Sequence, residues 1–236
     1  MSPIHVVTIC SPQTNAYNRN QPSMRLSGKK RGRRSPQARF IGECRGLDFV
    51  NSGDSPEISQ FDWMGNGERL IGWLEQAGLV PRAVLRQFKR DVHSGKLDRV
   101  ASRARELREW LRAVIYKYRG DSLAGVDISA FETLNRILLE DERYIQIVRS
   151  HGNGPPLTLR LMRRWSTPDS LVWAIAESVA HLIYEEDFRR IKQCEGCSLL
   201  FLCRTRRHER KWCSMSTCGN RAKQAAHRNR QKSPQA

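Results

Sequence analysis

The residues best suited to carry chemistry are four cysteines in the last quarter of the chain. They form two close pairs in the pattern C-x2-C-x15-C-x4-C, at Cys194, Cys197, Cys213 and Cys218. Two thiolates at a glycine-containing turn can bind one ion, and a second pair completes the tetrahedron that zinc adopts in structural sites. The surrounding segment has too few apolar residues to fold without a metal. The spacing therefore predicts one structural zinc ion, and nothing in the sequence favours iron–sulfur ligation.

A basic amphipathic helix is expected to follow, from about residue 215 to 231. At about 100° per residue, one face collects groups able to pack on the zinc site: Met215, Cys218, Ala222, Ala225 and Ala226. The opposite face has a centre and two cationic edges: Asn220, Gln224, His227 and Gln231, flanked by Lys223 and Arg230 on one side and Arg221 and Arg228 on the other. This arrangement suits a helix in the major groove of DNA, with bases read in the middle and phosphates bound at the edges. A solvated polar face, or a surface for RNA, acidic proteins or membranes, has the same pattern.

The charge distribution favours a polyanionic partner. The formal net charge of +17 is concentrated at the two ends, because residues 1–39 carry +8 and residues 189–236 carry +11. The body between them, residues 40–188, carries −2. A near-neutral body with two basic ends indicates electrostatic attachment to a polyanion, and DNA is the partner we expect.

Residues 1–38 are predicted to be a disordered basic arm, since they are rich in Ser, Pro, Asn, Gln and Arg and have no apolar periodicity. Within the arm, Arg31-Gly32-Arg33 resembles an AT-hook, which lies in the narrow minor groove of A·T-rich DNA, although the usual flanking prolines are missing. A solvated basic tail explains the segment equally well. Translation from Met24 would remove residues 1–23 altogether.

Residues 39–188 predict a mainly α-helical domain with a small sheet, so the expected class is α+β with a C-terminal treble-clef-like finger over 189–236. The type of the segment 39–51 stays open. Helical periodicity is found at 66–78, 81–92, 98–119, 127–140 and 168–187. The last of these is apolar nearly all round and is expected in the core. Residues 144–149 and 156–165 around His151-Gly-Asn-Gly154 predict a β-hairpin. We expect this body to fold without the finger.

The chain shows no enzyme motif of the kinds that bind phosphate, hold zinc in a HExxH pair or present a nucleophilic serine, so no enzymatic activity is expected. His181 is interpreted as a packed core histidine, and Cys10 and Cys44 as buried or idle thiols. The acidic run 185–187 is expected to pair with the basic module. The sequence lacks a secretory signal and the run of about 18 apolar residues that a membrane span needs. We therefore expect a cytoplasmic protein.

Several of these motifs together resemble the CGNR zinc-finger family: Cys194-Glu-Gly-Cys197, Leu200-Phe201, Arg210-Lys-Trp-Cys213-Ser-Met215 and Cys218-Gly-Asn-Arg221. The front of the body is similar to the ABATE domain that precedes that finger: Phe40-Ile-Gly, Leu47-Asp-Phe-Val-Asn51 and Trp73-Leu with Ala77-Gly-Leu79. The resemblance spans about 40–230 and implies a bacterial, stress-responsive transcription regulator with four cysteines on zinc. Family members commonly carry an Asp shortly after the Leu-Phe pair, where this chain has Leu202 and Cys203. That departure adds a fifth thiol, which is able to replace one of the four.

Two other functions stay open beside DNA binding. The first is RNA binding by the same finger, for which Phe201, Trp212 and His227 are the nearby stacking groups. The second is a protein-interaction or ligand-sensing body with a purely structural finger. A transcription regulator would act at the nucleoid. A homodimer is also compatible with the sequence. Neither the DNA target nor an effector ligand of the body follows from the sequence.

Overall fold

The computed structural model describes residues 36–53, 61–90, 95–149, 155–205, 207 and 209–232. Three features predicted from the sequence lie outside these residues: the arm up to residue 35 with its Arg31-Gly32-Arg33 core, the thiol of Cys10, and the hairpin turn at 151–154. The described part begins at Pro36 and contains the body and the finger.

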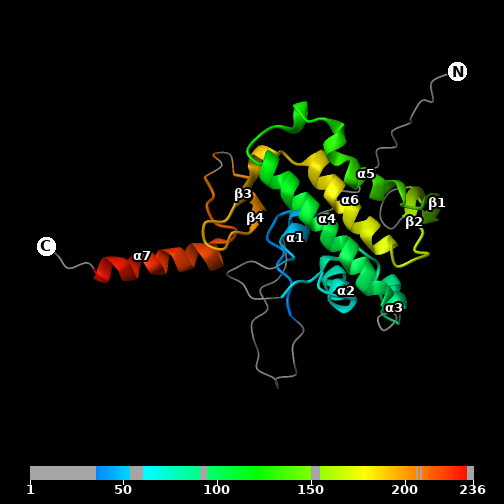
Figure 1. Ribbon diagram of the computed structural model, residues 1–236, viewed down its shortest axis with the longest axis horizontal. Coiled ribbons are helices and arrows are strands. Elements are labelled where there is room, and N and C mark those ends of the chain that lie inside the picture. The colour runs from blue at the N-terminus through cyan, green and yellow to red at the C-terminus, as the bar shows by residue number, and fades with distance from the viewer. Residues whose placement is uncertain are drawn as a thin grey trace. The chain divides into compact units, whose positions relative to one another are not determined.

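Helix α6 (Ser170–Glu185) is central to the core of the body. It contacts α1 (Arg45–Val50), α4 (Lys96–Tyr118) and α5 (Glu132–Leu139), and it lies beside α4 in Figure 1. Its apolar side chains are almost all buried: Leu171, Val172, Trp173, Ile175, Val179 and Leu182. The prediction that a helix apolar nearly all round belongs in the core is confirmed.

Helices α2 (Gly67–Ala77) and α3 (Arg82–Lys89) follow the expected pattern. The side chain of Asn66 accepts a hydrogen bond from the backbone N–H of Arg69 at 2.9 Å and caps the start of α2. Gly78 ends the helix in the left-handed conformation, with φ of 69°, which a glycine adopts without strain. The face predicted to be apolar is buried: Leu70, Ile71, Trp73, Leu74 and Ala77.

The helix expected over 127–140 is shorter than the periodicity indicated. Asp127 accepts a hydrogen bond from the N–H of Ser129 at 2.9 Å and starts a 3-10 turn, η3 (Ile128–Phe131), so the α-helical part is α5 alone. Another 3-10 turn, η2 (Leu123–Gly125), precedes it. Local side-chain bonding by Asp competes with helical bonding, which explains the shortened helix.

His181 is not a packed core histidine, contrary to the expectation. Its side chain is 43% exposed, and its Nδ1 lies 2.7 Å from Oε1 of Glu185 one turn further along α6. Tyr184 beside them is also exposed. Although most of α6 is buried, its last part has a solvent-facing stripe, and His181 lies on that stripe.

Two strands, β1 (Arg143–Arg149) and β2 (Leu157–Arg163), pair antiparallel and confirm the predicted hairpin. The segment 39–51, whose type the sequence left open, contains α1. None of the helices in the described ranges combines the length and the apolar character needed to cross a lipid bilayer.

The C-terminal module begins after a 3-10 turn, η4 (Phe188–Arg190). Strands β3 (Ile191–Gln193) and β4 (Leu200–Leu202) pair antiparallel, and a π-helical turn, η5 (Met215–Gly219), leads into α7 (Asn220–Lys232). A short hairpin and a helix around a cysteine cluster agree with the expected treble-clef-like finger. The described chain is thus mainly helical, with two small antiparallel sheets.

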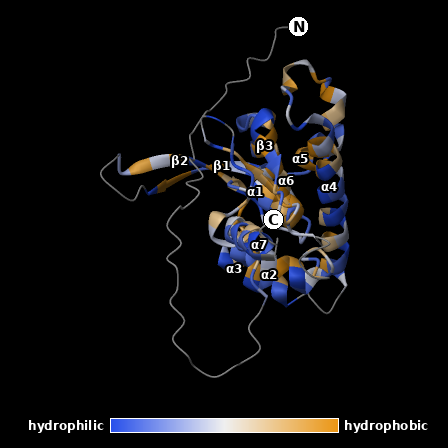
Figure 2. Cartoon of the chain, turned by 90° about the vertical axis from the view of Figure 1, so that its left-hand side faces the viewer, coloured by the Kyte–Doolittle hydropathy of each residue, from blue (hydrophilic) through white to orange (hydrophobic). Residues whose placement is uncertain are grey.

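The finger and the body share one hydrophobic core. Four buried side chains from the finger and from the turn before it pack in the same cluster as the body helices: Phe188, Ile191, Leu200 and Leu202. The acidic end of α6 contacts the module as expected, because Glu186 accepts a hydrogen bond from Arg204 at 2.6 Å. Figure 2 shows the contrast with α7, which is largely hydrophilic while α6 is largely hydrophobic. The finger hairpin is therefore part of the core, and α7 is not.

Candidate metal centre and nucleic-acid interface

The four cysteines predicted to bind zinc come together in one buried cluster. Their sulfur atoms all lie within 4.8 Å of one another. The Sγ atoms of Cys197 and Cys213 are 3.5 Å apart, and those of Cys213 and Cys218 are 3.8 Å apart. A tetrahedral zinc site with Zn–S bonds of about 2.3 Å has sulfur atoms about 3.8 Å apart. The donor set and its spacing therefore fit one structural zinc ion, held by Cys194, Cys197, Cys213 and Cys218.

The first pair lies in the turn between β3 and β4. The N–H of Cys194 donates to the carbonyl of Leu199 at 2.9 Å, and the N–H of Ser198 donates to the carbonyl of Cys194 at 3.0 Å. Ser198 has a φ of 58°, which reverses the chain tightly. A Cβ at Gly196 would lie 3.2 Å from the Cβ of Cys218. Glycine at this position therefore lets the second pair approach the first.

Burial disfavours thiolates in this cluster unless a cation is present. It raises the pKa of Cys197 to about 11 and also raises the pKa of Cys213. Burial acts in the same direction on Cys194, but backbone hydrogen bonds from Cys213 and Gly196 outweigh it and lower the pKa of that thiol. A bound metal ion deprotonates coordinating thiols outright. Zinc binding here must accordingly release protons, and acid must weaken it.

Arg210 fixes the second cysteine pair to the body. Its guanidinium donates to the carbonyl of Trp212 at 2.9 Å, to the carbonyl of Cys213 and to the carboxylate of Glu43. The same group lies over the ring of Phe201, 4.6 Å from its centroid. Sequence reasoning found Arg210 only as part of a family motif, because nothing in its residue type reveals a partner far along the chain.

Asn51 links α1 to β4 through side-chain hydrogen bonds. The sequence did not predict this contact. Its Nδ2 donates to the carbonyl of Leu200 at 2.8 Å, and its Oδ1 accepts from the N–H of Leu200 at 2.9 Å. The amide side chain thus satisfies both backbone groups of a finger residue, as a neighbouring strand would. The Leu47-Asp-Phe-Val-Asn51 motif was a signal for the family but not for this contact.

Cys203 does not replace any of the four ligands. It is buried outside their cluster, with its Sγ 3.2 Å from Oγ1 of Thr205, and its N–H donates to the carbonyl of Arg190 at 2.8 Å. Cys203, by which this chain departs from the family pattern, is therefore a packed thiol. Cys44 is half-buried, and burial raises the pKa of its thiol to about 12, which makes it unreactive near neutral pH.

Asp48 is a fully buried carboxyl next to the finger contact. Its Oδ1 accepts from the N–H of Gly42 at 2.8 Å, and the carbonyl of Gly42 accepts from the N–H of Leu202 in β4 at 3.2 Å. Burial raises the pKa of Asp48 from 3.8 to about 6, against the opposing effects of Gly42 and Arg45. The ionised form is thus less favourable in the folded state than in the unfolded state.

A raised carboxyl pKa gives the pH dependence of stability a definite sign. The contribution of the protonated Asp48 carboxyl to the free energy of unfolding is fully present below about pH 4 and is lost as the pH rises through about 6. We expect the difference in unfolding free energy between Asp48→Asn and wild type to shift in favour of the variant by about 1 kcal/mol from about pH 5 to about pH 7.5. Urea denaturation of both zinc-loaded proteins across this range measures it. The quantity compared is the slope of the unfolding free energy against pH. Equal slopes in the two proteins would refute the raised pKa of Asp48.

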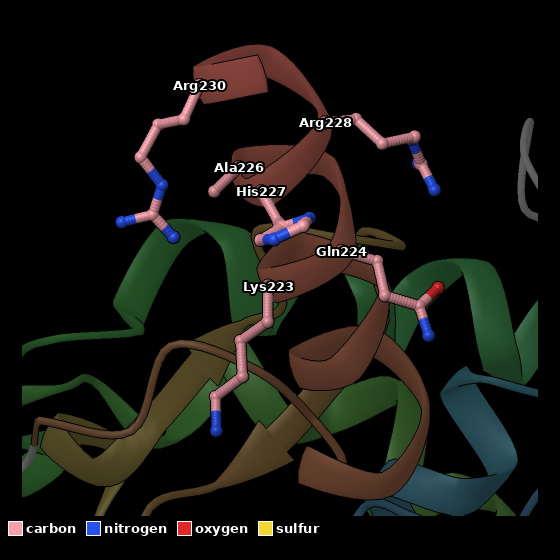
Figure 3. A pocket seen from close by; sticks show the side chains of 6 residues that line it. All are labelled: Lys223, Gln224, Ala226, His227, Arg228 and Arg230. Carbon is pink, nitrogen blue, oxygen red and sulfur yellow. The ribbon is translucent and has the colours of Figure 1, made fainter.

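The residues predicted to contact nucleic acid lie on α7, and all seven are exposed: Asn220, Arg221, Lys223, Gln224, His227, Arg228 and Arg230. Figure 3 shows Lys223 and Arg230 on one side of the helix, Gln224 and Arg228 on the other, and His227 between them. The helix therefore exposes all the predicted cations, with His227 between its two sides and Gln224 beside Arg228 rather than in the centre.

The packing face of this helix is narrower than predicted. Ala222 and Ala225 are half-buried, whereas Met215 and Ala226 are exposed. The π-helical turn η5 precedes α7 and interrupts the regular 100° progression on which the prediction depended. The side-chain amide of Asn220 donates to the carbonyl of Ser216 at 3.3 Å.

A depression of about 590 Å³ lies along α7, and all six lining residues belong to this one helix: Lys223, Gln224, Ala226, His227, Arg228 and Arg230 (Figure 3). Side chains of a single helix cannot enclose a small ligand. The hollow is an open surface between long side chains that a large partner would have to cover.

Comparison with protein families gave two matches. The family described as "Putative stress-induced transcription regulator", ABATE, matches residues 45–186, and the CGNR zinc finger matches residues 190–231. A search of curated proteins found no match. The two matched ranges correspond to the body and to the finger with α7.

Proposed function

This chain belongs to the ABATE family, with a CGNR zinc finger at its C-terminal end, and from that membership we propose that it is a zinc-dependent DNA-binding protein that regulates transcription. In this proposal it acts at the nucleoid of a bacterial cytoplasm and catalyses no reaction. Zinc holds the finger in shape, α7 contacts DNA, and the body senses a signal or mediates assembly.

The cationic surface of α7 is the observation that carries the proposal. The helix contains no acidic residue, and its four described cationic side chains are exposed: Arg221, Lys223, Arg228 and Arg230. None of these four pairs with a carboxylate among the described residues. Unpaired exposed cations on one helix suit phosphate oxygens, and the amide and the imidazole that lie among them suit base edges.

The placement of the aromatic residues favours DNA over RNA. Recognition of single-stranded RNA typically needs exposed rings on which bases stack. Phe201 is fully buried under Arg210, and Trp212 is half-buried against the cysteine cluster. Of the three rings considered from the sequence, His227 alone is exposed. The finger thus offers little stacking surface for single strands.

Two substitutions on α7 separate phosphate binding from base reading. We expect Arg228→Ala to weaken binding to every duplex alike and to lower the magnitude of the salt slope by about 1. Gln224→Ala should instead cost about 1–3 kcal/mol on the preferred site and little on random duplex. Sequencing the DNA recovered with the protein from cells identifies the preferred site, and mobility shifts across a salt series measure both effects.

Arg136→Ala provides the charge-matched control, because Arg136 is an exposed cation on α5 in the body. It should leave the affinity and the salt slope unchanged. If Gln224→Ala and Arg228→Ala act equally on all duplexes, α7 does not read bases. Equal or tighter binding of single-stranded RNA, or no binding of nucleic acid at low salt, would reject DNA as the partner.

A further inference from the structure

The β1–β2 hairpin has an uncovered apolar face. Side chains alternate between the two faces of each strand, so that five aliphatic side chains lie on one side of the hairpin. All five are more than half exposed: Ile145, Ile147, Leu157, Leu159 and Leu161. Ile145 lies opposite Leu161, and Ile147 lies opposite Leu159. We call these five residues the apolar hairpin face. Single exposed aliphatic residues are ordinary, but a continuous group of five usually has a partner.

Ion pairs hold the hairpin in place. Asp141, whose side chain is 2% exposed, accepts from Nε of Arg143 at 2.6 Å and from Nε of Arg163 at 2.7 Å. Glu177 of α6 binds the same two guanidinium groups at 2.9 Å and 3.0 Å. These contacts fix the first residue of β1 and the last residue of β2 to the body. The apolar face is therefore presented by an anchored element rather than left bare by a loose one.

The exposed apolar area of this face is large enough for self-association. Five aliphatic side chains that are more than half exposed present on the order of 500 Å² of apolar surface. Two such faces together would remove about 1,000 Å² from water, which is the lower bound for a specific interface. A two-stranded sheet is also marginal alone, and a second apolar layer stabilises it.

The composition of the face favours a second copy as the occupant. The five side chains are uncharged, and two of the arginines on the same side of the hairpin, Arg143 and Arg163, are paired with Asp141 and Glu177. The third, Arg149, lies at the far end of the face, opposite Leu157. The chain as a whole carries +17, but this excess belongs to residues 1–39 and 189–236, while residues 40–188 carry −2. The two strongly basic ends of the chain contribute no residue to this face, so two copies can meet through its apolar centre. We propose that the apolar hairpin face binds the same face of a second copy, in a two-fold symmetric dimer.

Sedimentation of the full-length, zinc-loaded protein over a concentration series tests this proposal. Wild type should dimerise, and Ile147→Thr with Leu159→Thr should weaken dimerisation by about 100-fold, because each substitution acts twice in a symmetric interface. Threonine retains a high strand propensity, and both positions are exposed, so the fold should persist. Leu157→Thr alone is a milder second variant and should give an intermediate loss.

Leu139→Thr is the matched control, since Leu139 is an equally apolar residue, highly exposed but on α5. It should dimerise like wild type. A wild-type monomer at about 100 μM, a concentration far above the affinity expected of a specific interface, would overturn the proposal. A dimer unaffected by the hairpin variants would do the same. Neutral lipid vesicles are included as a probe, and binding to them that the hairpin variants abolish would assign the face to a membrane instead.

Discussion

Cys194→Ser is expected to lose the zinc ion and to lower the unfolding temperature of the whole described fold, not of the finger alone. The four sulfur atoms lie within 4.8 Å of one another, so removal of one leaves three buried thiols that no longer complete a tetrahedron. Structural zinc contributes about 10–16 kcal/mol of binding free energy in isolated fingers, which is as large as the whole stability of a typical domain. Because β3 and β4 belong to the core of the body, their loss reaches α1 and α6.

Elemental analysis and calorimetry measure this effect. Wild type should contain one zinc per chain and unfold in one main transition that chelator shifts to lower temperature. Cys203→Ser is the matched control, since it removes a buried thiol outside the cluster and should retain full zinc. Full zinc in a variant that lacks all four cysteines would disprove the assignment of the ligands.

A fragment of residues 39–188 is expected to be molten or insoluble. The sequence suggested an independent body, but the fragment lacks three buried aliphatic side chains of the shared core: Ile191, Leu200 and Leu202. Truncation of one such residue to alanine costs about 2–5 kcal/mol, so deletion of three removes most of the stability of an ordinary domain. Asn51 also loses both of its partners on Leu200.

Urea denaturation followed by near-ultraviolet circular dichroism distinguishes a packed fragment from a molten one. The control is a fragment of residues 36–236, which begins where the described fold begins and should unfold cooperatively. Cooperative unfolding of 39–188, unaffected by chelator, would show that the finger contributes little to the core.

The sequence by itself determined the features that depend on neighbours along the chain. The zinc ligands were predictable because two short spacings place four thiols at turns. Helix α2 was predictable from its apolar period and from Gly78, and the exposed polar face of α7 from its period of 3.6 residues. The β1–β2 pairing was predictable from β-favouring residues on both sides of a glycine-rich turn.

Tertiary structure alone decided which parts of the chain meet. Asn51 binds Leu200 across 149 residues, and Arg210 binds Glu43 across 167, and neither contact has a signature in local periodicity. Burial likewise depends on what packs against each face, so an apolar helix has His181 in solvent and an apolar hairpin has its aliphatic residues uncovered. Spacing and periodicity describe the preferences of one segment, whereas the shared core of finger and body arises from the packing of segments far apart in the chain.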